Sequence, residues 1–213
     1  MSKLNRDIQT DPIKIVSAEF FTSAFTVQQL PEESLPEIAF AGRSNVGKSS
    51  LINALLLRKK LVKTSNTPGR TQSINFFIIN KAFYFVDLPG YGFAKVPKGV
   101  QAKWKHLIEG YLQKRKTLKA VVLIMDSRHP AMPNDIQLYH WLSARSFVVI
   151  PVLTKIDKLS RNEWEKSRRE CARILTISPE SIVLFSATEK TGRHELWERI
   201  LELMDINNLV DKA

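Results

Sequence analysis

From residue 37 onward, short apolar runs alternate along the chain with longer segments in which apolar residues recur at helical spacing. The apolar runs have the length of strands and lie at 38–41, 74–79, 83–86, 120–125, 148–153 and 182–185. The helical segments lie at 49–57, 100–115, 134–144, 162–175 and 193–204. Strands that alternate with helices predict a mostly parallel sheet with helices on both faces.

Only three residues separate the second and third apolar runs. A connection of that length forms a hairpin, so one strand is expected to run antiparallel to the others in a sheet of about six strands. Residues 1–12 are polar and are expected to form a flexible tail, whereas 13–36 carry apolar side chains that can pack on the domain as an N-terminal extension. The pattern predicts a single α/β domain over 37–207, followed by a C-terminal tail at 208–213.

Composition indicates a polyanionic partner and excludes several classes of protein. The chain has 213 residues and a formal net charge of +11, which favours binding to nucleic acid. Its single cysteine, Cys171, cannot form an internal disulfide, which suits a reducing compartment. No apolar stretch approaches the ~18 residues of a membrane-spanning helix, and the N-terminus shows no apolar core of a secretory signal. We therefore expect a cytoplasmic protein that does not enter a membrane.

The clearest chemical motif is a phosphate-binding loop between a predicted strand and a predicted helix. Its glycines let the chain turn so that consecutive backbone N–H groups point at a phosphate, next to the N-terminus of the helix. Lys48 can reach the β- and γ-phosphates, and the hydroxyl of Ser49 can bind Mg²⁺. The loop and the residue after it are Gly42, Arg43, Ser44, Asn45, Val46, Gly47, Lys48, Ser49 and Ser50.

A second motif, Asp87-Leu88-Pro89-Gly90, follows the predicted strand at 83–86. The Asp87 carboxylate can hold Mg²⁺ through water, and the Gly90 N–H can contact a γ-phosphate. A polar loop at 66–73 precedes it, where a switch region is expected. In that loop Thr71 is the candidate second hydroxyl ligand of Mg²⁺ in the triphosphate state. Its neighbours, also expected at the nucleotide, are Gly69, Arg70, Gln72 and Ser73.

A third motif, Thr154-Lys155-Ile156-Asp157, follows the predicted strand at 148–153 and identifies the base. The Asp157 carboxylate can accept hydrogen bonds from N1–H and the 2-amino group of guanine, whereas adenine lacks that amino group and presents an acceptor at N1. The aliphatic stem of Lys155 can cover the base. After the last predicted strand come residues whose backbone N–H groups can bond the guanine O6, namely Ser186, Ala187 and Thr188. Together the motifs predict binding of GTP and GDP.

In their order and spacing, these motifs resemble those of the translation-factor-related class of P-loop GTPases and, within it, the EngB family, also called YihA or YsxC. The segment at 67–72 also carries the resemblance. The more family-specific features are the Tyr91-Gly92-Phe93-Ala94 extension after Gly90 and the threonine at 154, where asparagine is commoner. The resemblance spans roughly residues 18–205 and implies a three-layer, Ras-like G domain. It also implies a role in assembly of the large ribosomal subunit and in normal cell division and septation.

Many small GTPases place a glutamine directly after the Asp-x-x-Gly motif to orient the attacking water. Here that position is Tyr91, and no side chain presents itself as a general base. We therefore expect slow GTP hydrolysis supported by Lys48, Mg²⁺ and backbone amides. Asn45 stands where cation-dependent relatives keep a potassium ligand, so K⁺ is a candidate activator, and a purely structural role for Asn45 is the alternative. An internal arginine finger from Arg43 or Arg70 is a further alternative.

Positive charge is concentrated in two stretches that flank the predicted switch loops, which favours contact with ribosomal RNA. We expect GTP to order 64–73 and 88–98 and so to present this basic surface to the large subunit. The alternatives to this ribosomal role are a switch that acts on a protein effector and an RNA-binding protein that does not turn over GTP. The chain itself is expected to be a monomer. The basic residues are Arg58, Lys59, Lys60, Lys63, Lys95, Lys98, Lys103, Lys105, Lys114, Arg115 and Lys116.

Overall fold

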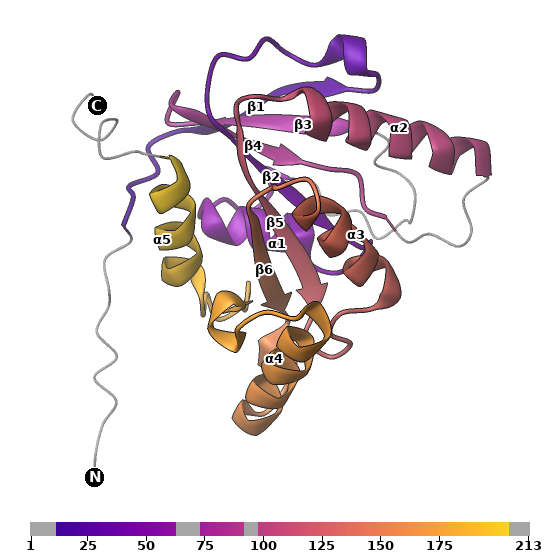
Figure 1. Cartoon of the computed structure of the whole chain (residues 1–213). Helices are drawn as coiled ribbons and strands as arrows, with labels where there is room; N and C mark the ends of the chain where they lie inside the picture. Colours follow the sequence, from indigo (N-terminus) through magenta and orange to yellow (C-terminus); the bar gives the residue numbers. More distant parts are fainter. Residues whose placement is uncertain (1–11, 63–72, 92–97, 205–213) are drawn as a thin grey trace.

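The computed structural model describes residues 12–62, 73–91 and 98–204. A sheet of seven strands runs through this part of the chain, in the order β1-β3-β4-β2-β5-β6-β7 (Figure 1). Strand β3 pairs antiparallel with β1 and with β4, and the other neighbouring pairs are parallel. The strands are β1 (Ala18–Ala24), β2 (Glu37–Gly42), β3 (Ile74–Ile79), β4 (Phe83–Asp87), β5 (Leu118–Asp126), β6 (Val149–Thr154) and β7 (Val183–Leu184).

The predicted α/β class with one antiparallel strand is confirmed, but the sheet has one strand more than predicted. The additional strand is β1, which the N-terminal extension contributes at the edge of the sheet. Three consecutive residues of β1 are exposed, among them Phe20 and Phe21, and its register with β3 shifts between Phe20 and Thr22. A bulged edge strand of this kind shows neither the buried run nor the regular alternation by which a strand is found in a sequence.

Helices cover both faces of the sheet (Figure 1). Helices α1 and α5 pack over one face, where Trp197 of α5 stacks on Phe85 of β4 with 5.4 Å between the ring centroids. Helices α2 and α3 pack on the opposite face, and α4 packs beside α3. None of the helices in the described ranges is both long enough and apolar enough to cross a membrane. The helices are α1 (Lys48–Leu55), α2 (Lys98–Lys114), α3 (Pro133–Ser143), α4 (Arg161–Leu175) and α5 (Arg193–Met204), with short 3-10 helices η1 (Val27–Gln29), η2 (Ile156–Lys158) and η3 (Pro179–Ser181).

A buried ion pair fixes the C-terminal end of α2 to the start of β2. The Glu37 carboxylate accepts hydrogen bonds from Arg115 Nε at 3.0 Å, from the Tyr111 hydroxyl at 2.8 Å and from the Thr117 hydroxyl at 2.8 Å. Arg115 is only 8% exposed. It therefore does not belong to the basic surface that the sequence predicted, because its charge is neutralised inside the fold.

The other basic residues of the two stretches lie elsewhere than expected where the structure describes them. Helices α1 and α2 run from the carboxyl ends of the parallel strands back to their amino ends. The exposed residues that follow α1 or lie at the end of α2 are therefore at the amino-end edge of the sheet, away from the loops that the motifs form. They are Arg58, Lys59, Lys60, Lys114 and Lys116. The structure does not describe Lys63 and Lys95, nor the side chains of Lys98, Lys103 and Lys105.

Candidate nucleotide-binding site

The predicted phosphate loop connects β2 to α1, as the motif requires. Two of its residues have left-handed backbone conformations, Asn45 with a φ of 61° and Gly47 with a φ of 105°. Glycine and asparagine adopt this region at the lowest cost, so the sequence suits the turn. Gly47 caps α1 without a side-chain hydrogen bond, which leaves the first N–H groups of the helix available to an anion.

Two predicted residues of the phosphate and metal site lie side by side. The Lys48 ammonium forms an ion pair with the Asp87 carboxylate at the end of β4, and the two side chains are 10% and 4% exposed. Ser49, the next residue of α1, is half-buried. Carboxylate and hydroxyl oxygens are hard ligands of the kind that Mg²⁺ takes, together with water and substrate phosphates. Asp87 and Ser49 therefore fit this ion, which when bound neutralises charge on the β- and γ-phosphates.

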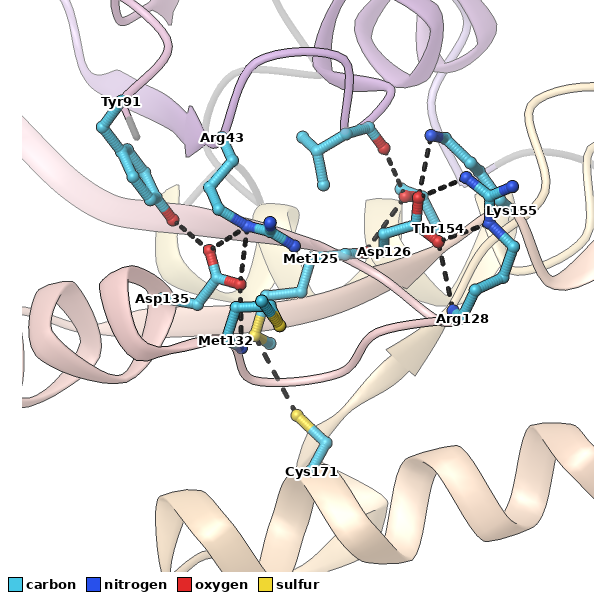
Figure 2. Close-up of polar contacts among 11 residues, drawn as sticks. Arg43, Tyr91, Met125, Asp126, Arg128, Met132, Asp135, Thr154, Lys155 and Cys171 are labelled. Carbon is cyan, nitrogen blue, oxygen red and sulfur yellow. Dashed lines mark hydrogen bonds and ion pairs between the residues drawn. The ribbon is translucent and has the colours of Figure 1, made fainter. Parts of the chain in front are cut away.

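The third motif is tied to the phosphate loop (Figure 2). The Thr154 hydroxyl lies 2.6 Å from the carbonyl oxygen of Val46 and 3.0 Å from that of Met125, so it joins the loop to β5. Lys155 has a φ of 62°, and its ammonium donates to the carbonyl oxygen of Asn45 at 2.7 Å. Its aliphatic stem lies beside Gly47 of the phosphate loop, and its contact with the base stays a prediction.

Asp157 is held as an ionised acceptor. Burial acts to raise the pKa of its carboxyl, but hydrogen bonds from Ser186 at 2.8 Å and from Lys158 outweigh burial and lower the pKa below its ordinary value. The Ser186 N–H donates to the carbonyl oxygen of Thr191 at 3.1 Å, so it is not the donor to guanine O6 that the sequence suggested. Ser186 instead orients the Asp157 carboxylate through its hydroxyl. The N–H groups of Ala187 and Thr188 are left as candidates for O6.

Several predicted residues contribute through the main chain or lie elsewhere. Val46, Leu88 and Ile156 are buried in the core, so they shape the loops without presenting side chains to a nucleotide. The hydroxyl of Ser73, directly before β3, donates to Asn75 at 3.0 Å. Four predicted residues fall outside the described ranges, namely Gly69, Arg70, Thr71 and Gln72.

Sequence reasoning missed Asp126, at the carboxyl end of β5. Its carboxylate accepts hydrogen bonds from Lys155 Nζ at 2.8 Å and from Arg128 Nε at 2.9 Å (Figure 2). Burial opposes these bonds, but together they lower the pKa of Asp126 well below its ordinary value. The sequence carried the relevant pattern, because Asp126 directly follows a buried apolar strand, as do Asp87 and the third motif.

Sequence reasoning also missed Asp135. Its carboxylate binds the side chains of Arg43 and Tyr91, the two residues considered above for a part in GTP hydrolysis. Arg43 Nε donates to its carboxylate at 3.0 Å, and the Tyr91 hydroxyl donates to it at 2.8 Å (Figure 2). Arg43 is therefore turned toward α3 and does not lie as an internal arginine finger. Tyr91 likewise points at α3, so it does not take the place of the missing glutamine.

The comparisons with known proteins agree with these motifs. Residues 37–155 match a family model described as 50S ribosome-binding GTPase. A probable GTP-binding protein EngB of Geotalea daltonii is 53% identical over 186 residues, which are 87% of this chain and 90% of the relative. Its counterpart in Bacillus subtilis is 46% identical over 194 residues, which are 91% of this chain and 100% of the relative. A crystal structure of a probable GTP-binding protein engB matches with a TM-score of 0.66 and 27% identity over 79% of this chain and 98% of that chain. The resemblance that the motifs indicated is thus confirmed: the chain belongs to the EngB family of P-loop GTPases.

Proposed function

We propose that this GTPase is a slow, nucleotide-dependent switch that uses Mg²⁺ and acts in assembly of the large ribosomal subunit. Through that role it would also be needed for normal cell division and septation. The observation that carries the nucleotide part is the ionised Asp157, oriented by Ser186 beside a phosphate loop that Thr154 and Lys155 tie in place. The description of the matching family model supports the ribosomal part.

Slow hydrolysis is proposed because, within the part of the chain that the structure describes, the two side chains considered for the attacking water point elsewhere. Tyr91 and Arg43 both bind Asp135, so among the described residues Lys48 and the loop amides, together with Mg²⁺, would stabilise the developing charge. A charge supplied from outside the chain would complete the site. We propose K⁺ as one such charge, bound with the help of Asn45, whose side chain is exposed on the phosphate loop.

Turnover of GTP is expected to be faster in KCl than in NaCl at equal ionic strength. We expect a stimulation of about tenfold or more, a small part of the ~10³–10⁵ that an arginine finger supplies. Asn45→Gly, which adopts the left-handed backbone of this position at low cost, should lose this stimulation while its rate in NaCl stays close to that of the wild type. Steady-state phosphate release measures both effects, and equal wild-type rates in the two salts would contradict the role of K⁺.

Binding to large ribosomal subunits is expected to be at least about fivefold tighter with a non-hydrolysable GTP analogue than with GDP. Co-sedimentation with purified subunits measures this difference. The double variant Lys59→Gln/Lys60→Gln removes two exposed charges at the amino-end edge of the sheet, away from the nucleotide loops. It should bind more weakly with both nucleotides and with a shallower dependence on salt, because fewer phosphates are neutralised.

The matched control is Lys166→Gln/Arg169→Gln, which removes the same two positive charges from exposed positions on α4. This variant should bind like the wild type. Identical, salt-insensitive binding with both nucleotides would contradict the proposed function. Binding that survives high salt and is not competed by RNA would instead favour a protein effector.

A further inference from the structure

A buried carboxylate on α3 joins two nucleotide loops that are distant in sequence (Figure 2). Asp135 lies in the first turn of α3, and its side chain is fully buried. It accepts hydrogen bonds from Arg43 Nε at 3.0 Å, from the Tyr91 hydroxyl at 2.8 Å and from the Met132 N–H at 3.2 Å. The bond from Met132 alone would serve to cap the helix. The other two tie α3 to the phosphate loop and to the residue that follows Gly90.

The main chain of Tyr91 is held against the phosphate loop as well. The Ser44 N–H donates to the carbonyl oxygen of Tyr91 at 3.3 Å, and the Tyr91 N–H donates to that of Gly42 at 3.4 Å. Gly90 lies so close to the loop that a Cβ added to it would be 2.7 Å from Ser44 Oγ. The residue whose N–H is expected to contact the γ-phosphate is thus next to a residue tethered through both its backbone and its side chain.

The contact of Tyr91 with Asp135 is costly to break. The Tyr91 hydroxyl is a donor at neutral pH, and because burial raises its pKa well above the ordinary value, it stays a donor in alkaline solution too. Burial also raises the pKa of Asp135, against the bonds from Tyr91 and Arg43 that favour its charged form. A buried carboxylate with these partners is costly to separate from any of them, because the group left behind is unpaired in a region of low dielectric constant.

We propose that Tyr91, held by Asp135 and Arg43, is a positioning residue that keeps Gly90 in place for the γ-phosphate and thereby raises the affinity for GTP relative to GDP. GDP has no γ-phosphate and does not use this contact. Holding Gly90 before the nucleotide arrives reduces the ordering that GTP binding requires, so the benefit falls on the triphosphate alone. The inference rests on the proposed nucleotide switch and names a residue that sets its preference.

The experiment compares two tyrosines in the same chemical setting. Tyr91→Phe removes only the hydroxyl that binds Asp135. Tyr111→Phe is the matched control, because the Tyr111 hydroxyl also donates at 2.8 Å to a buried carboxylate paired with an arginine, but at the start of β2. Dissociation constants for a non-hydrolysable GTP analogue and for GDP are measured by titration calorimetry for the wild type and both variants. Thermal unfolding is recorded for each.

We expect Tyr91→Phe to bind the GTP analogue about fivefold more weakly and GDP less than about twofold more weakly. Tyr111→Phe should leave both constants unchanged, although its thermal stability falls at least as much. Equal weakening of both nucleotides in Tyr91→Phe, or no change in either, would overturn the proposal. A wild-type protein that bound neither guanine nucleotide would instead overturn the proposed switch itself.

Discussion

Asp157→Asn is expected to weaken GTP binding by about 10³-fold. In the wild type the carboxylate offers two acceptor oxygens, and the Ser186 hydroxyl and Lys158 hold it in its charged form. The asparagine amide has nearly the same shape but replaces one acceptor with an NH₂ donor. That NH₂ faces the N1–H or the 2-amino group of guanine, so two donors meet and neither has an acceptor.

The same substitution should favour a different base, and this makes the prediction specific. Xanthine carries a carbonyl oxygen at C2 in place of the amino group of guanine, and the asparagine NH₂ can donate to that oxygen. We expect Asp157→Asn to bind XTP more tightly than GTP, whereas the wild type prefers GTP. Competition between XTP and a fluorescent GTP analogue measures the preference of each protein.

Binding of XTP also serves as the control for folding and for the phosphate site. Lys48, Asp87 and the loop amides are unchanged in the variant, so a protein that binds XTP has an intact phosphate site. Loss of both nucleotides would point to a damaged fold, and unchanged affinity for GTP would contradict the role assigned to Asp157.

The site motifs could be predicted from the sequence because each follows its own apolar strand. The carboxyl ends of parallel strands meet at one edge of a sheet, so residues that come directly after such strands converge without any knowledge of long-range contacts. Asp87 ends β4 and Asp157 comes after β6, and the structure ties their loops to the phosphate loop.

Asp135 could not be predicted from the same pattern. It lies in the first turn of a helix, where an acidic residue is ordinarily a cap that faces solvent. Its partners Arg43 and Tyr91 are 92 and 44 residues away in the sequence, and no local feature connects them. Only tertiary packing turns this cap into the junction of two nucleotide loops.

The burial of Arg115 was hidden for a related reason. It stands between Lys114 and Lys116 in a basic stretch, and nothing local distinguishes the one side chain that turns inward. Its partner Glu37 precedes an apolar strand, where a charged residue ordinarily marks the end of the buried segment. Two charges that each suggested a solvated position neutralise one another inside the fold.

That burial makes Glu37→Ala the substitution with the largest expected effect on stability. The variant leaves Arg115 as an uncompensated buried charge, because the two side chains are 4% and 0% exposed. It also removes the acceptor of the Tyr111 and Thr117 hydroxyls. We expect the free energy of unfolding to fall by about 3–5 kcal/mol, measured by urea denaturation. The partly exposed pair between Arg199 and Glu195 provides the control, since Glu195→Ala should cost at most about 1 kcal/mol.

A second variant separates the loss of the ion pair from the cost of the charge left behind. Glu37→Ala/Arg115→Met removes both charges and keeps an apolar side chain of similar length in the buried position. Because most of the expected cost in Glu37→Ala comes from the unpaired guanidinium, the double variant should be more stable than the single one. If the double variant is no more stable, the hydrogen bonds of Glu37 to Tyr111 and Thr117 carry the effect, and the buried charge of Arg115 does not.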